Sequence, residues 1–216
     1  EAARYVHVDI RIPNLRYQIP SGKIIRWIRA GLSDPQLVEV PGRQMLLSFE
    51  DLVSMRVIAF LRALDYSFPR IRKAEATLRA ITGHPRPFAT EQIWGLDKSA
   101  SDIFAEVGRI LLAATKGGQI AFIEMVEEHL INVHGLTFDQ RHVAESWSPR
   151  RGILLHPQIQ FGRSCIAGTR IPTTDLAGMV EAGDKEEFLA VSYGISVEQV
   201  HQAVTWEREL RQLVAS

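Results

Sequence analysis

The chain has almost no cysteine and no long apolar run. Its single cysteine, Cys165, excludes an internal disulfide, and with no second thiol nearby we expect no redox chemistry. Apolar residues nowhere continue for the roughly 18 positions that a membrane span needs, and no charged-then-apolar leader follows Glu1. We therefore expect a cytoplasmic protein without a membrane partner. Internal repeats and low-complexity tracts are also missing.

What is present is enough apolar material for folded domains. The chain has 216 residues, 46% of them hydrophobic, which suffices for one large domain or two small ones with apolar cores. The formal net charge is zero, but the two parts of the chain carry opposite net charges. Residues 1–90 hold 14 Lys and Arg against 8 Asp and Glu, a net charge of +6, and residues 91–216 hold 11 against 17, a net charge of −6. We expect the first half to attract or tolerate a polyanion, and the second half not to.

Residues 1–83 predict a compact unit of helices around a short hairpin. Ser21 has the residue type of an N-cap for the helix GKIIRWIRAG, in which Trp27 is expected on the surface. The apolar stripe of that helix is expected at Ile24, Ile25 and Ile28. The segments LVEV, PGR and QMLL then predict a two-stranded hairpin. A hairpin in this place has the form of the wing in a winged helix-turn-helix.

Two longer helices are predicted after the hairpin. Ser48 caps the helix SFEDLVSMRVIAFLRAL, whose first turn is acidic, where the helix dipole favours negative charge. The second helix follows Ser67 and Pro69 and ends at Gly83. Its apolar stripe is expected at Ile71, Ala74, Leu78 and Ile81, and its remaining surface is basic.

The middle of the chain, residues 84–150, is expected to be a connector and a helical interface region. A helix is predicted over about residues 120–133, and its apolar face suits a core or a subunit interface equally well. The segment SWSPRRG, residues 146–152, is rich in residues that favour turns and predicts a linker.

The last 65 residues or so, 151–216, predict a helix-turn-helix domain of three to four helices. A helix with Leu189 and Ala190 inward ends near Tyr193, and Gly194 supplies the turn. A second helix begins at Ser196, with Val200 and Ala203 inward. Ser196 stands three residues before Gln199, which is the spacing of a capping box. The predicted fold is therefore mainly α, with one winged unit and one C-terminal helix-turn-helix unit.

Both units resemble known families. The segment HPQIQFGRSCIAGTRIPTTDLAGMVEAGDKEEFLAVSYGISVEQVHQAVTWE resembles domain of unknown function 433, with FGR and AGTRIP as its hallmarks. LSFEDLVSMRVIAFLRALDYSFPRIRKA resembles the helix pair of MerR-like winged domains. Together they look like two-domain antitoxins of the VapB kind from mycobacteria and relatives. The resemblance implies a PIN-domain ribonuclease toxin as partner, and it covers most of the chain except about residues 91–150.

The MerR-like pattern has one departure. DIRIPNLRYQIP stands where a tight turn normally joins the first two short helices, so either NLRY or SGKIIRWIR could be the helix that reads DNA. The long dimerising helix and the metal-binding cysteines of metal-sensing MerR regulators are missing, and effector sensing does not carry over.

Basic residues cluster around the predicted reading helix and wing. Phosphate contacts supply most of the non-specific affinity for DNA, and a basic face on a winged unit suits them, although a solvated helix face is the alternative. The candidate DNA-binding residues are Arg16, Lys23, Arg26, Arg29 and Arg43.

The C-terminal helix-turn-helix is acidic where a DNA-reading helix would be basic. Phosphates would meet repulsion there, whereas a basic protein partner such as a ribonuclease would be attracted. Trp206 is either an aromatic anchor for that partner or a core residue against the FGR segment. The candidate partner-binding residues are Glu186, Glu187, Glu198, Trp206 and Glu207.

No pattern predicts chemistry. His129, His134 and His142 are too irregularly spaced for a helical metal site, and neither Cys165 nor His156 has a recognisable orienting carboxylate. We therefore expect no enzyme activity, no metal and no cofactor. The leading hypothesis is an antitoxin of a type II system, a homodimer that binds a ribonuclease toxin and its own double-stranded operator DNA. The alternative is a free-standing MerR-like regulator that responds to a small ligand.

Overall fold

The computed structural model describes residues 2–6, 21–30, 38–40, 44–63, 66–94 and 135–215. The described helices are α1 (Ala2–Tyr5), α2 (Ser21–Arg29), α3 (Phe49–Ala63), α4 (Phe68–Thr82), α5 (Glu91–Trp94), α8 (Thr173–Glu181), α9 (Glu186–Tyr193) and α10 (Val197–Ala215), with the single 3-10 turns η1 (Pro87–Ala89) and η3 (Gln160–Gly162). The described strands are β1 (Val38–Val40), β2 (Gln44–Leu46), β3 (Leu136–Phe138), β4 (Ala144–Arg150), β5 (Ile153–Leu155) and β6 (Cys165–Ile166).

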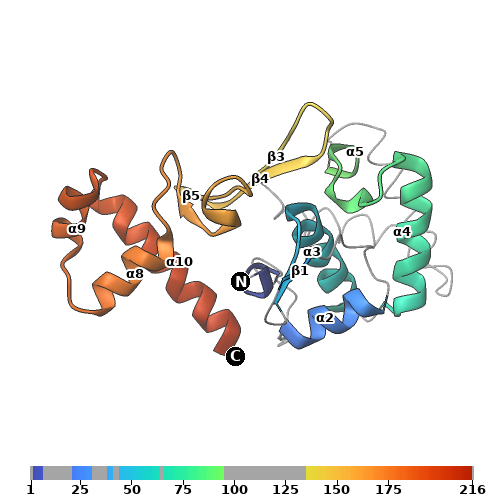
Figure 1. The fold of residues 1–216 in the computed structure, drawn as a ribbon, viewed down its shortest axis with the longest axis horizontal. Coiled ribbons are helices and arrows are strands. Elements are labelled where there is room, and N and C mark those ends of the chain that lie inside the picture. The colour runs from blue at the N-terminus through green and yellow to red at the C-terminus, as the bar shows by residue number, and fades with distance from the viewer. Residues whose placement is uncertain are drawn as a thin grey trace, which may run out of the picture.

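The chain is largely helical, as the sequence predicts, and its helices form two groups. Helices α2 to α5 lie at one end of the molecule and α8 to α10 at the other, with strands β3 to β5 between them (Figure 1). Among the described residues, no helix combines the length and the apolar character that crossing a membrane requires.

Helix α3 is the central helix of the N-terminal group. Residues 51–61 are buried on every side of it, although they include polar Asp51 and Arg56. Its predicted cap at Ser48 is confirmed: the backbone N–H of Asp51 donates to Ser48 Oγ at 3.0 Å, and the backbone N–H of Ser48 donates to Asp51 Oδ2 at 2.9 Å. This reciprocal pair satisfies two backbone donors that a helix start leaves open.

Helix α4 keeps most of its predicted apolar stripe. Ile71, Ala74 and Leu78 are buried, and Gly83 ends the helix in the left-handed conformation, with φ 67°. Ile81 was predicted inward and is 44% exposed, so that prediction is wrong. The buried face also includes Glu75, so its centre lies between Ala74 and Glu75. At 100° per residue, Ile81 then lies at the edge of the buried face.

Helix α2 has a wider inner face than its three isoleucines suggest. Ile24 and Ile28 are buried, but Trp27, expected on the surface, is 2% exposed. Its ring packs edge-on against Phe68 at the start of α4, with 5.9 Å between ring centres and 70° between ring planes. Contact with a second helix thus decides the position of Trp27, which periodicity alone could not show.

The predicted hairpin is confirmed: β1 pairs antiparallel with β2, with Glu39 opposite Met45. The helix-turn-helix expected before it falls partly on residues 7–20 and 31–37, which lie outside the described residues. Arg16, Arg43 and the helix predicted over about 120–133 also lie outside them.

A four-stranded antiparallel sheet replaces the predicted linker. Its strand order is β3-β4-β5-β6, and residues 146–152 supply most of β4 and the turn to β5. The linker prediction is therefore wrong. Pro149 argued against a strand, because proline cannot donate a hydrogen bond to a neighbouring strand. The pairing of β4 with β5 shifts register between Trp147 and Arg150, and this irregularity accommodates the proline.

The domain boundary expected between residues 150 and 151 falls inside this sheet, between β4 and β5. The turn that leads into β3 also depends on the sheet. Gly135 has φ 97°, and a Cβ there would lie 2.2 Å from the backbone oxygen of Ser148. Only glycine allows the two backbones to approach so closely.

The C-terminal helix-turn-helix is confirmed. Helix α9 ends at Gly194, which has φ 65°, and α10 follows after one short turn. The predicted capping box is present, because Ser196 N–H donates to Gln199 Oε1 at 2.9 Å and Gln199 N–H donates to Ser196 Oγ at 3.2 Å. The residues predicted inward are buried, namely Leu189, Ala190, Val200 and Ala203.

Candidate partner-binding surface

The outer side of the C-terminal helix-turn-helix is acidic. Glu187 and Glu198 are exposed, as expected of residues that meet a partner. Glu186 is half-buried, and its Oε2 lies 3.4 Å from Nδ1 of His201 on α10. The structure therefore places the three predicted acidic residues on the two helices that this turn joins. That they bind a partner stays a prediction.

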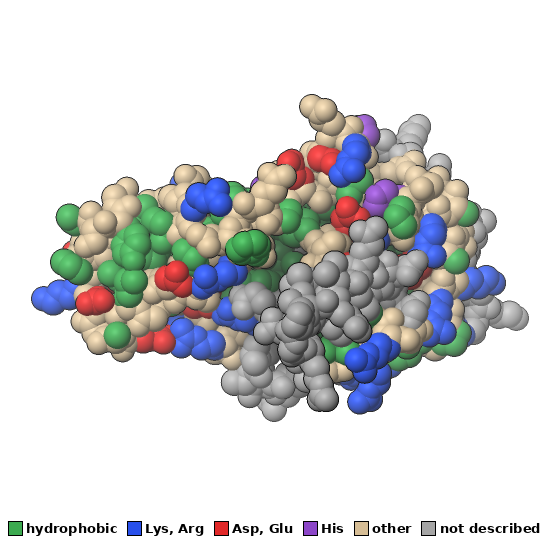
Figure 2. All heavy atoms as spheres, in the orientation of Figure 1, with side chains coloured by type: hydrophobic (Ala, Val, Ile, Leu, Met, Phe, Trp, Pro, Cys, Tyr) green, Lys and Arg blue, Asp and Glu red, His purple; other side chains and the backbone are tan. Residues whose placement is uncertain are grey.

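Apolar side chains are exposed among these acids. Val191 is 84% exposed, Phe188 64%, Val197 41% and Tyr193 38%. Figure 2 shows hydrophobic side chains gathered with acidic ones at the left end of the visible face, over α8 to α10. Apolar residues that cluster on a surface are typical of a binding site, because their burial against a partner is favourable. We call α9 and the start of α10, with these four residues, the α9 surface.

Trp206 and Glu207 do not belong to this surface, which corrects their prediction as partner-binding residues. Trp206 is 2% exposed and Glu207 1% exposed. The Trp206 ring stacks on Tyr5 of α1, with ring centres 6.5 Å apart and ring planes 6° apart. Both residues are covered by α1, which lies two hundred residues away in the sequence. The spacing of apolar residues within α10 therefore could not predict their burial.

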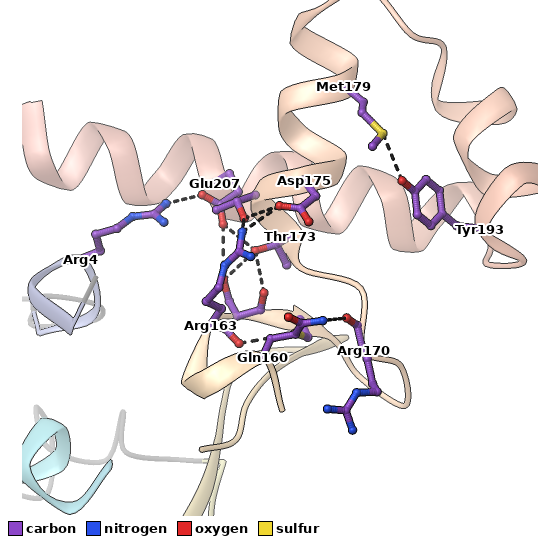
Figure 3. Close-up of polar contacts among 12 residues, drawn as sticks. Arg4, Gln160, Arg163, Arg170, Thr173, Asp175, Met179, Tyr193 and Glu207 are labelled. Atoms are coloured by element: carbon purple, nitrogen blue, oxygen red, sulfur yellow. Dashed lines mark hydrogen bonds and ion pairs between the residues drawn. The ribbon is translucent and has the colours of Figure 1, made fainter. Parts of the chain in front are cut away.

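Glu207 is the centre of a buried polar cluster (Figure 3). Thr173 Oγ1 donates to Glu207 Oε1 at 2.5 Å, Ser164 Oγ donates to the same oxygen at 3.4 Å, and Arg4 binds the other carboxylate oxygen. The Tyr5 hydroxyl lies 3.3 Å from Ser164 Oγ. A buried carboxylate is tolerated when its charge and lone pairs are satisfied in this way. The cluster fastens α1 to the C-terminal helices.

A second connection joins α3 to α1 and to the four-stranded sheet. Arg56 is 7% exposed, its Nη1 donates to the backbone oxygen of Tyr5 at 2.6 Å, and its guanidinium lies 3.9 Å from the ring centre of Trp147 in β4. A cation over an indole face is attracted by the ring quadrupole. The N-terminal helices and the sheet thus share one continuous core.

The basic candidates that the structure describes lie on α2. Arg26 and Arg29 are exposed, and Lys23 is half-buried. Arg70, Arg72 and Lys73, at the start of α4, are also exposed, and Arg72 donates to the backbone oxygen of Ala30 at the end of α2. Lys and Arg side chains gather over α2 and α4 at the lower right of the visible face (Figure 2).

The described residues hold no group of three or more metal-ligating side chains. His142 pairs with Glu91 at 2.6 Å in an exposed turn, and His129 and His134 lie outside the described residues. Cys165 is fully buried, and burial raises the pKa of its thiol, which disfavours the reactive thiolate.

Comparison with known proteins gives a family match within the C-terminal unit. Residues 153–206 match the family described as protein of unknown function (DUF433). The DUF433 match begins at β5 and ends within α10, so it contains η3, α8, α9 and the turn before α10. The exposed apolar and acidic residues of the α9 surface all lie inside it.

Two mycobacterial proteins are similar over nearly the whole chain. The uncharacterized protein Rv2308 of Mycobacterium tuberculosis is 25% identical over 239 residues, which cover 96% of this chain and 92% of that protein. The X-ray crystal structure of Rv2018 from Mycobacterium tuberculosis superposes with a TM-score of 0.69 at 18% identity and covers 94% of each chain. This likeness shows a shared fold that extends well beyond the DUF433 segment.

The exposed apolar residues are the part of the site that sequence reasoning missed. The segment EEFLAVSY is apolar at four consecutive positions, Phe188 to Val191. One face of a helix cannot bury four successive residues, so some must point outward. That pattern was the available signal for the α9 surface.

Proposed function

We propose that this chain is the antitoxin of a type II toxin–antitoxin pair, which covers a PIN-domain ribonuclease toxin with its α9 surface and binds operator DNA with its basic N-terminal unit. The observation that carries the proposal is the exposed apolar group on α9, with Phe188 64% and Val191 84% exposed, on a helix-turn-helix that also exposes Glu187 and Glu198. A ribonuclease binds a polyanion, so its own surface is basic and complementary to this one. Inhibition would follow from steric cover and mass action.

DNA is a poor occupant for the α9 surface. Residues 173–198 contain six Asp and Glu against one Lys, so duplex phosphates would be repelled. The basic exposed residues of α2 and of the start of α4 have the opposite charge. The proposal therefore assigns operator DNA to the MerR-like N-terminal unit, with α2 as the helix that approaches the duplex.

Toxin binding is tested with the double variant Phe188→Ser, Val191→Ser. Exposed side chains can be made polar at little cost to folding, while the loss of apolar anchors weakens a protein interface by about 30-fold or more in Kd. The measurement is the affinity for the ribonuclease encoded by the neighbouring reading frame, with its residual RNA cleavage as a second readout.

The matched control is Ile81→Ser, because Ile81 is also an exposed apolar residue, 44% exposed, but lies on α4. It should bind the ribonuclease as the unchanged chain does. Equal affinity of the double variant and of the unchanged chain would show that the α9 surface is not the toxin-binding surface.

DNA binding is tested by replacing Lys23, Arg26 and Arg29 together with Ala. Each lost phosphate contact should flatten the dependence of log K on log salt by roughly one unit, and overall affinity for duplex DNA should fall. Titration of a labelled duplex of the upstream region at several salt concentrations measures both. Arg141→Ala is the control, since Arg141 is 79% exposed in the turn between β3 and β4. Unchanged affinity and slope in the triple variant would exclude α2 from DNA binding.

A further inference from the structure

The turn at η3 has an unfavourable backbone conformation, and it exposes an aromatic side chain to solvent. Gln160, Phe161 and Gly162 have φ of 48°, 55° and 79°, and Phe161 is 100% exposed. A positive φ is uncommon for residues with a Cβ, and two in succession need external support. That support comes from Gln160, whose Nε2 donates to the backbone oxygen of Arg170 at 3.0 Å. Folding alone gives no reason to hold a phenylalanine outward in this way.

The η3 turn is linked to the α9 surface along one stripe of α8. Arg163, which follows the turn, pairs with Asp175 at 2.8 Å, and the Tyr193 hydroxyl donates to Met179 Sδ at 3.4 Å. Asp175 and Met179 are four residues apart, and therefore neighbours on one helix face. Figure 3 shows both contacts on α8, with Arg163 at one end and Tyr193 at the other.

The stripe between these contacts is open. Gly178 is exposed, and a Cβ added there would meet nothing within 4 Å. Asp175 and Ala182, on the same stripe, are also exposed. The outer side of α8 between Asp175 and Ala182 is therefore open to a partner that also contacts the η3 turn and α9.

We propose that Phe161, the outer stripe of α8 and the α9 surface form one docking surface for the basic ribonuclease partner, with Phe161 as an aromatic anchor that enters an apolar pocket of that partner. This inference rests on the proposed function and extends it to a second helix and to a strained turn. Charge complementarity selects the partner, because the segment 173–198, which contains α8 and α9, holds six acidic residues against one lysine.

Two other occupants are less compatible with this surface. A single-stranded nucleic acid could stack on Phe161, with Arg163 and Arg170 nearby, but Arg163 is already paired with Asp175 and the remaining charge repels phosphates. A second copy of the chain would bring two acidic surfaces together at α8 and α9. Both are outcomes that the following experiment distinguishes.

The test uses the full chain and the purified ribonuclease from the neighbouring reading frame, with affinity measured by calorimetry. Phe161→Ala should raise Kd by about 30-fold, as expected for the loss of a central aromatic anchor. Gly178→Trp should raise it at least as far, because the indole would occupy the open stripe. Replacing a helical glycine does not weaken the helix itself. Ala76→Trp is the matched control, since Ala76 is a small exposed residue on α4, and its Kd should be unchanged.

The outcomes separate this inference from the proposed function. If Phe161→Ala and Gly178→Trp bind normally while Phe188→Ser, Val191→Ser does not, the larger surface is wrong and the proposed function stands. If the unchanged chain does not bind the ribonuclease, both are wrong. If Phe161→Ala turns a dimer into a monomer in light scattering, or abolishes binding of a labelled single-stranded RNA, the turn serves a second copy or RNA, and the inference is overturned.

Discussion

Replacing Arg86 with methionine is expected to lower the free energy of unfolding by about 3–5 kcal/mol, the range found when one partner of a buried ion pair is removed. The Arg86 side chain is 5% exposed, and its Nε donates to Asp51 Oδ1 at 2.5 Å, while Asp51 is 0% exposed. Methionine retains much of the length of arginine but leaves the carboxylate of Asp51 buried without its cation. Burial opposes the charge of Arg86, but hydrogen bonding and attraction to Asp51 outweigh burial and raise the pKa of Arg86, so its guanidinium keeps its charge.

The measurement is thermal and denaturant unfolding of the full chain. For a chain of this length the expected loss corresponds to a fall in Tm of roughly 6–20 °C. Arg141→Met is the matched control, because Arg141 also pairs with an aspartate, Asp139 at 3.0 Å, but is 79% exposed. The backbone N–H of Val143 donates to Asp139, and this hydrogen bond is the main reason why the pKa of Asp139 is lowered. Asp139 therefore keeps its charge when Arg141 is replaced. Equal losses in the two variants would contradict the importance of burial.

Replacing Trp206 with alanine is expected to cost about 3–5 kcal/mol, as large-to-small changes of buried aromatic residues do. The indole is 2% exposed, stacks on Tyr5 and lies under the Arg150 guanidinium at 5.9 Å. Its removal should leave a cavity between α1 and α10. Because α1 is held to α10 by this stack and by the Arg4–Glu207 pair, we also expect faster hydrogen exchange in α1.

Trp206→Phe is the control for this cavity. It retains an aromatic ring and removes an indole Nε1 that has no hydrogen-bond partner among the described residues, so its cost should be well below that of alanine. Unfolding curves of both variants measure the two losses of stability, and native-state hydrogen exchange measures the opening of α1. A stable Trp206→Ala variant with reduced ribonuclease affinity would instead restore Trp206 as a partner contact.

Some candidate residues were readable from the sequence and others were not, for a common physical reason. The acidic character of the α9–α10 turn follows directly from Glu187 and Glu198, which are exposed as expected. Trp206 and Glu207 lie on α10, the helix of Glu198, and their neighbours in the sequence are equally polar. Their burial by Tyr5 and Arg4 depends on contacts across the whole chain, and no local pattern encodes such contacts.

The sequence by itself determined the features whose stabilising interactions are local. Helices α3 and α4, the β1–β2 hairpin and the α9–α10 turn are built from caps, glycine stops and apolar spacings that span a few residues. Only the tertiary structure decided the four-stranded sheet, the burial of Trp27 and Trp206, and the exposure of Phe161. The sheet and the two buried tryptophans depend on which distant segment arrives at a given face, and burial by a distant partner outweighs the weak preferences of a local pattern.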